Sequence, residues 1–144
     1  MTTRRRLSPS SLHPGAPYAY AMATVPGETL LFLAGACPID PDGRVAEPDD
    51  VEAKAKLAVA NLVAVLDEAG CSLDDVLRTT VYVVAADQAE LVRGWEAVRS
   101  ELRGTDPPST LVGVSTLGYT GQRIEIEAVA GLGSAPPAGN ANQG

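Results

Sequence analysis

Histidine and cysteine are scarce in this chain. Its 144 residues include one histidine, His13, and two cysteines, Cys37 and Cys71. A zinc site needs three or four such ligands, and a nucleophilic cysteine needs a base beside it. The sequence therefore predicts no metal site, no disulfide framework and no histidine-based triad, and it favours a reducing, cytoplasmic location. Cys37 is left open as a nucleophile, although a small buried thiol is the favoured interpretation.

Basic residues are also few, and long apolar runs are absent from the sequence. Eleven basic residues face 18 acidic ones, and the net charge is −7. Such a field repels a phosphate backbone, so we expect no nucleic-acid partner. The apolar stretch from Leu30 to Ala34 is far shorter than the roughly 20 residues that a membrane span requires. We therefore expect no membrane partner either.

Aromatic residues make up 4% of the chain, while hydrophobic residues make up 45%. The core must therefore consist mainly of Ala, Val, Leu and Ile. A chain of this length supports one domain with a single core. We expect this domain over residues 1–132, beginning with an irregular N-terminal arm over 1–17, and a disordered tail over 133–144.

Two helices and several strands are predicted from periodicity. Apolar residues recur at helical spacing over 51–69, where Gly70 ends the pattern, and again over 88–102. Segments rich in β-branched residues or with alternating apolar residues predict strands over 18–23, 29–34, 76–84, 109–114 and 123–132. The turn residues Pro26 and Gly27 lie between the first two strands, which predicts a hairpin.

This order of elements predicts an α+β fold, a mixed β-sheet with two helices packed on one face. The other face of the sheet would then need cover. Since the chain has no third predicted helix, a neighbouring subunit is the natural cover, and we expect an oligomer.

The last predicted strand carries two carboxylates. Side chains alternate along a strand, so Ile124 and Ile126 point toward the helices while Glu125 and Glu127 point away. The two carboxylates would lie ~7 Å apart on one face. Covered by a subunit, such a pair can serve acid–base chemistry. Left uncovered, it is an ordinary solvated sheet face, and both interpretations stay open.

Several segments together resemble the Rid (YjgF-like) superfamily over about residues 7–132. They are Gly15-Ala16-Pro17-Tyr18, Leu33-Ala34-Gly35 followed by Pro38, Asn61-Leu62, Thr79-Thr80-Val81-Tyr82-Val83, Val112-Gly113-Val114 and Ile124-Glu125-Ile126-Glu127-Ala128. The resemblance implies a chorismate-mutase-like fold and a homotrimer that binds a small-molecule ligand in clefts between subunits. It also implies hydrolysis of reactive imines or enamines without a metal or organic cofactor.

The resemblance assigns roles to individual positions. Glu125 matches the catalytic glutamate that handles water, Tyr18 a substrate-lining tyrosine, and Gly35 a glycine whose backbone approaches the ligand. Tyr119, in the loop before the last strand, is a further candidate for lining the cleft. We therefore expect Glu125 as the catalytic residue and the others as substrate-binding residues.

One expected residue is missing. Family members bind the substrate carboxylate through an arginine at the start of a strand, where this chain has Ser109 or, with a one-residue slip, Thr110. No arginine or lysine lies between Gly104 and Gln122. Neutral hydroxyls bind a carboxylate less strongly than a guanidinium does. Arg103 and Arg123 are the nearest substitutes in sequence, and without one of them the site suits a neutral or differently charged ligand.

Three functions stay open. The first is an enzyme that hydrolyses or tautomerises an imine, enamine or related carbonyl intermediate, with Glu125 as acid and base. The second is a non-catalytic trimer that binds a small molecule. The third is a ribonuclease or translation inhibitor, which the acidic balance disfavours.

Overall fold

The computed structural model describes residues 3–45 and 49–134. The elements in chain order are β1 (Arg5–Leu7), β2 (Ala21–Ala23), β3 (Glu28–Phe32), α1 (Val51–Glu68), the short 3-10 helix η1 (Leu73–Asp75), β4 (Val76–Val84), α2 (Gln88–Glu101), β5 (Ser109–Val114) and β6 (Ile124–Ser134). None of the helices in these two ranges is long and apolar enough to cross a membrane.

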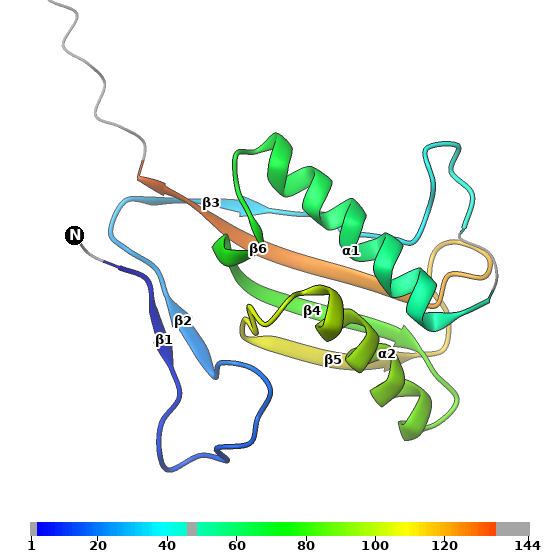
Figure 1. Cartoon of the computed structure of the whole chain (residues 1–144), viewed down its shortest axis with the longest axis horizontal. Coiled ribbons are helices and arrows are strands. Elements are labelled where there is room, and N and C mark those ends of the chain that lie inside the picture. The colour runs from blue at the N-terminus through cyan, green and yellow to red at the C-terminus, as the bar shows by residue number, and fades with distance from the viewer. Residues whose placement is uncertain (1–2, 46–48, 135–144) are drawn as a thin grey trace, which may run out of the picture.

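Four strands form the main sheet in the order β3-β6-β4-β5. β4 and β5 run parallel, whereas β6 is antiparallel to both β3 and β4. Both helices lie on one face of this sheet, as Figure 1 shows. The α+β architecture with a mixed sheet and two helices on one face is therefore confirmed.

The core lies between the helices and the sheet. Val81 and Val83 of β4 and Ile124 and Ile126 of β6 have no exposed surface. Their neighbours in sequence point to the other face, which no described segment of this chain covers. Phe32, at the edge strand β3, is 74% exposed there. The alternation expected for the last strand is thus confirmed.

The ends of both long helices follow local sequence signals. The side chain of Asp50 accepts a hydrogen bond from the Glu52 amide at the start of α1. Gly70, with φ +76°, ends that helix, because a left-handed backbone costs glycine little. The side chain of Asp87 caps α2 by accepting from the Glu90 amide.

The predicted hairpin is wrong. β2 pairs with β1 in a separate two-stranded sheet, and β3 pairs with β6. The expectation of an irregular arm over 1–17 is also wrong at Arg5–Leu7, which is strand β1. At the other end, β6 continues to Ser134, two residues into the expected tail. Residues 135–144 of that tail lie outside the described residues.

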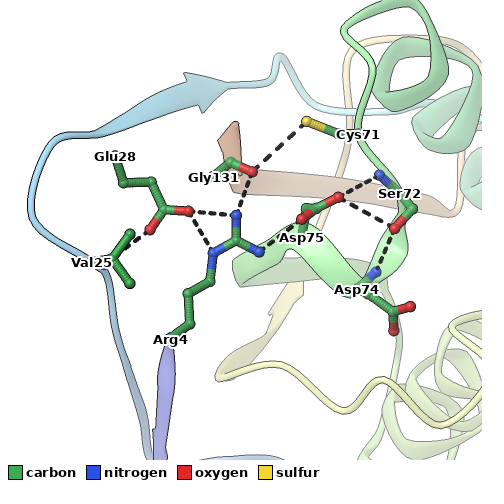
Figure 2. Close-up of polar contacts among 8 residues, drawn as sticks. All are labelled: Arg4, Val25, Glu28, Cys71, Ser72, Asp74, Asp75 and Gly131. Atoms are coloured by element: carbon green, nitrogen blue, oxygen red, sulfur yellow. Dashed lines mark hydrogen bonds and ion pairs between the residues drawn. The ribbon is translucent and has the colours of Figure 1, made fainter. Parts of the chain in front are cut away.

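Arg4 attaches the N-terminal segment to the body of the protein (Figure 2). Its guanidinium pairs with Glu28 and donates to Asp75 Oδ1 at 2.8 Å and to the carbonyl oxygen of Gly131 at 2.7 Å. The Glu28 side chain is 1% exposed, and the hydrogen bond from Arg4 lowers the pKa of that carboxyl. We call these four residues the Arg4 clamp.

Arg6 makes a second attachment, to the loop between α2 and β5. Its guanidinium donates to the carbonyl oxygens of Thr105 and Asp106 at 2.7 and 2.6 Å. The Ala19 amide also donates to the Asp106 carbonyl. Next to it, the ring of Tyr18 meets Trp95 of α2 edge to face, with ring centroids 6.5 Å apart. β1 and β2 are therefore held by partners far away in sequence.

Candidate functional site

Glu125 lies in β6 on the sheet face that the helices leave open. It stands opposite Tyr82 of β4 in the antiparallel register. Its neighbours Ile124 and Ile126 are fully buried against the helices, so the alternation of the strand turns Glu125 outward. The Glu125 side chain is half-buried, whereas Glu127 is exposed.

The loop after β3 runs alongside β6, next to Glu125. Ala36 and Ile126 exchange two backbone hydrogen bonds, of 2.8 and 3.0 Å, which bring this loop against β6. A Cβ atom at Gly35 would overlap the Glu125 carboxylate. Only glycine therefore fits at this position while the carboxylate stays where it is. The structure thus brings together Gly35 and Glu125.

Gln122 is a site residue that the sequence reasoning missed. It is 3% exposed, and its amide nitrogen donates to Glu125 Oε2 at 3.1 Å and to Cys37 Sγ at 3.1 Å. Its amide oxygen accepts from the Tyr119 amide at 3.1 Å. The sequence shows only a turn at these residues, and no local signal marks a glutamine that bonds a carboxylate.

Cys37 completes this cluster. The pKa of its thiol is raised by burial and by the charge of Glu125, while the hydrogen bond from Gln122 opposes the rise. The chain's one histidine, His13, lies in the segment between β1 and β2 and is not among the contacts of Cys37. A protonated thiol without a base is a poor nucleophile, which favours the packing interpretation of Cys37.

A cavity of about 510 Å³ lies beside Gly35 and Cys37. Tyr119, which is 47% exposed, lines it together with Ile39, Asn61 and Val65. Asn61 supports this wall by donating to the carbonyl oxygens of Cys37 and Ile39 at 2.8 and 2.9 Å. Tyr119 and Gly35 therefore share one cavity.

Ser109 and Thr110 point to opposite faces of the sheet. Ser109 shares a 2.6 Å hydrogen bond with the buried Thr79 hydroxyl, on the side of the helices. Thr110 lies on the open face, where its hydroxyl accepts from Arg78 Nη2 at 3.1 Å. Both are in β5, separated from Glu125 by β4, so one subunit does not bring them to the carboxylate.

Arg78 is the second residue that the sequence reasoning missed. It belongs to the outward set of β4 and lines a small hollow of about 110 Å³ with Phe32, Thr80 and Glu127. The sequence could have predicted its orientation, because Arg78 and Tyr82 are four residues apart in one strand and so lie on the same face of the sheet. Its importance emerges only once β5 is known to lie beside β4 in a register that puts Thr110 next to it.

Neither of the arginines proposed from the sequence lies beside Glu125. Arg123 pairs with Asp49 before α1, at 3.4 Å. Arg103 follows α2 and lines a different cavity, of about 560 Å³, with residues of α1 such as Lys56 and Asp67. Both side chains are therefore directed away from the open sheet face that carries Glu125.

Tyr18 has its partner away from Glu125, whereas the partner of Glu127 is Tyr82, which stands opposite Glu125. Tyr18 packs against Trp95 of α2, and its ring lies on the helix side of the molecule. Glu127 accepts a 2.8 Å hydrogen bond from the Tyr82 hydroxyl, and this bond raises the pKa of Tyr82. Within the described ranges no group of three or more His, Cys, Asp or Glu side chains could hold a metal ion.

These observations define a class of protein: a small α+β domain with a half-buried carboxylate packed against a glycine loop on an uncovered sheet face. The model of the family described as Endoribonuclease L-PSP matches residues 9–132. The chain belongs to this family, which includes the Rid (YjgF-like) proteins.

Similar proteins agree with this assignment. The 2-iminobutanoate/2-iminopropanoate deaminase of Rattus norvegicus is 32% identical over 94% of this chain and 96% of its own length. The protein of the same name from Salmonella typhimurium is 35% identical over 71% of this chain and 79% of its own. YyfB of Yersinia pestis, from the Rid family, has 30% identity and a TM-score of 0.81, covering 91% of this chain and all of that one.

Proposed function

We propose that this protein hydrolyses the imine of a small amino-acid-derived molecule to a carbonyl compound and ammonia, with Glu125 as acid and base. The observation that carries the proposal is the Glu125 carboxylate, half-buried, packed against Gly35 and bonded by Gln122. The names of the deaminase relatives give the reaction class.

The chemistry needs no cofactor. Glu125 accepts a proton from a water molecule as the water oxygen adds to the imine carbon. The protonated carboxyl then returns the proton to the nitrogen, which gives a carbinolamine. In a second transfer, Glu125 takes the hydroxyl proton and passes it to the amine nitrogen; the carbon–oxygen double bond forms, the carbon–nitrogen bond breaks, and ammonia leaves. The net change is addition of one water and loss of one ammonia. Gly35 has no side chain, and the Glu125 carboxylate lies against its backbone in the space that a side chain would fill.

We further propose that the active unit is a homotrimer whose clefts lie on the open sheet face. Phe32 and Leu30 on β3 are exposed, at 74% and 43%, and a neighbouring subunit would bury them. Ser109, Thr110 and Tyr18 lie far from Glu125 in one chain. Of these three, Thr110 lies on the open face, and in the trimer it would reach the Glu125 of a neighbouring subunit.

Arg78 is our candidate for the substrate carboxylate. Its guanidinium lies at Thr110, one of the two positions where the family's arginine is missing. Guanidinium forms bidentate, charge-assisted bonds with a carboxylate that a hydroxyl cannot replace. We expect Arg78→Gln to raise KM for an imino acid about tenfold or more, with a smaller effect on kcat.

Imine hydrolysis tests the proposal. An amino-acid oxidase generates short-lived imines from several amino acids, and semicarbazide traps the fraction that has not hydrolysed. The wild-type protein should lower the trapped fraction, and Glu125→Gln should abolish this effect. If the wild-type protein accelerates the hydrolysis of none of these imines, the proposal that it is an imine hydrolase is wrong.

The alternative is a trimer that binds a ligand without turnover. The neutral Ser109 and Thr110 favour it. In that case Glu125→Gln would leave ligand affinity unchanged, measured on the ligand that native mass spectrometry finds. A ribonuclease, which the family description names, would lose RNA affinity steeply with rising salt. The net charge of −7 is unfavourable for it.

A further inference from the structure

The amide of Gln122 occupies the centre of the site without being part of the reaction proposed above. It is 3% exposed, and its two amide hydrogens face three acceptors: Glu125 Oε2 at 3.1 Å, Cys37 Sγ at 3.1 Å and the Ile124 carbonyl at 3.2 Å. The side chain thus contacts both polar groups next to Gly35.

The orientation of this amide is determined by its other end. The Gln122 oxygen accepts from the Tyr119 backbone amide at 3.1 Å, and a backbone N–H can only donate. The nitrogen must therefore face Glu125 and Cys37. A second bond, from the Gln122 backbone N–H to the Tyr119 backbone carbonyl, closes the same turn. The Gln122 side chain is consequently hydrogen-bonded to both Tyr119 and Glu125.

We propose that Gln122 is a positioning residue that holds the Glu125 carboxylate against Gly35 and ties it to the Tyr119 loop. The proposal rests on the proposed function for its kinetic consequence but not for its geometry. A hydrogen-bond donor directed at one carboxylate oxygen leaves the other oxygen free for water. Removing the donor should let the Glu125 side chain rotate away from its place.

The thiol of Cys37 supplies a readout that does not depend on activity. Burial and the charge of Glu125 raise the pKa of Cys37, and the Gln122 hydrogen bond lowers it. Glu125 is the charged group beside the thiol, and Asp40 lines the same cavity. Gln122→Met removes the donor at similar size and should raise the pKa of Cys37. Glu125→Gln removes the charge and should lower it.

The measurement is the rate of carbamidomethylation of Cys37 by iodoacetamide against pH, followed by mass spectrometry. The buried Cys71 serves as the internal reference. Lys54→Met is the matched control, because Lys54 Nζ donates to the Gly121 carbonyl at 2.6 Å and anchors the same turn without contacting Cys37 or Glu125. Circular dichroism checks that each variant is folded.

We expect Gln122→Met to slow the modification of Cys37 at pH 8 by roughly threefold or more, since only the thiolate reacts. Glu125→Gln should accelerate it, and Lys54→Met should leave it nearly unchanged. In the imine assay, Gln122→Met should lower kcat roughly 10- to 100-fold, as a misplaced catalytic group does. Gln122→Glu keeps the size of the side chain and should slow the carbamidomethylation of Cys37 even more. The added negative charge raises the pKa of the thiol further.

Equal effects of Gln122→Met and Lys54→Met on the thiol would overturn the proposal, as would no effect of either Gln122 variant. Gln122 would then only support the turn. If the wild-type protein hydrolyses no imine, the proposed function fails by itself. The thiol titration alone then decides whether Gln122 contacts Cys37 and Glu125 as described.

Discussion

At Gly35 the backbone comes so close to the Glu125 carboxylate that a methyl group would overlap it. Either the loop or the carboxylate must move when a side chain is added. We expect Gly35→Ala to lower kcat/KM for imine hydrolysis roughly 100-fold, a loss of about 2.7 kcal/mol in transition-state stabilisation. Steady-state kinetics at equal protein concentration measures this.

Gly113→Ala is the matched control for this substitution. A Cβ at Gly113 meets only the Leu91 side chain, at an ordinary contact distance of 3.5 Å. Its kcat/KM should stay within about twofold of the wild type. Should Gly35→Ala retain the wild-type value as well, the carboxylate is free to move without consequence, and Gly35 has no role in placing it.

Residues of the site differ in how far the sequence predicts them. Glu125 follows from alternation along one strand, and its proximity to Gly35 agrees with the family resemblance. Gln122 and Arg78 could not be found in the same way. Their partners, Cys37 and Thr110, become neighbours only through the pairing of strands that lie far apart in the chain.

Elements whose residues carry their own signal were predicted well. The strands over 76–84 and 109–114 have the bounds of β4 and β5, because β-branched and apolar residues predominate in both. The pairing of β1 with β2 carries no such signal. These three-residue strands are held by Arg4 and Arg6, whose partners lie 24 to 127 residues further along the chain.

The start of α2 depends on a local pair of side chains. Asp87 accepts from the Glu90 amide at 2.9 Å, and Glu90 accepts from the Ala86 amide at 2.8 Å. We expect Asp87→Ala to lower the free energy of unfolding by about 1 kcal/mol, the usual value of an N-cap. Urea denaturation followed by circular dichroism measures it. Asp42→Ala, in an exposed loop, should change the free energy by less than about 0.5 kcal/mol.

The Arg4 clamp makes the attachment of β1 depend on pH. The pKa of Glu28 is lowered from its usual value of 4.5, mainly by the hydrogen bond from Arg4. A lowered folded-state pKa adds stability that is fully present above about pH 4.5 and is lost as the pH falls through the folded value. Arg4→Met should remove this dependence and lower the free energy of unfolding at pH 7 by roughly 2 kcal/mol.

The pH series separates this effect from a simple loss of packing. Unfolding of wild-type protein and Arg4→Met is compared at pH 7, 5, 4 and 3. The difference between the two should shrink as the pH falls below 4.5. A constant difference over the whole series would mean that the Glu28 carboxylate contributes nothing through its charge.

On the scale of the whole molecule, the open face of the sheet exposes apolar side chains to solvent. Phe32 is 74% exposed on it, at the edge strand β3. We expect Phe32→Asp to convert the proposed trimer into monomers, because an aspartate cannot be buried in the interface without a partner. Light scattering coupled to size exclusion measures the mass.

Val92→Asp is the control for this substitution. Val92 is also exposed, at 43%, but lies on α2, on the opposite side of the sheet. It should leave the mass unchanged. A trimer that survives Phe32→Asp, or a wild-type protein that is monomeric, would contradict the proposed assembly. The clefts would then be open grooves of a single chain.

The Arg4 clamp has a consequence for the order in which the protein is made. Arg4 leaves the ribosome well before the Gly131 carbonyl that it binds, which is 127 residues further along. Synthesis runs from the N-terminus, so this partner does not yet exist while most of the chain is being translated. The segment around Arg4 therefore cannot complete its docking before Gly131 has been translated, even though Glu28 is made much earlier.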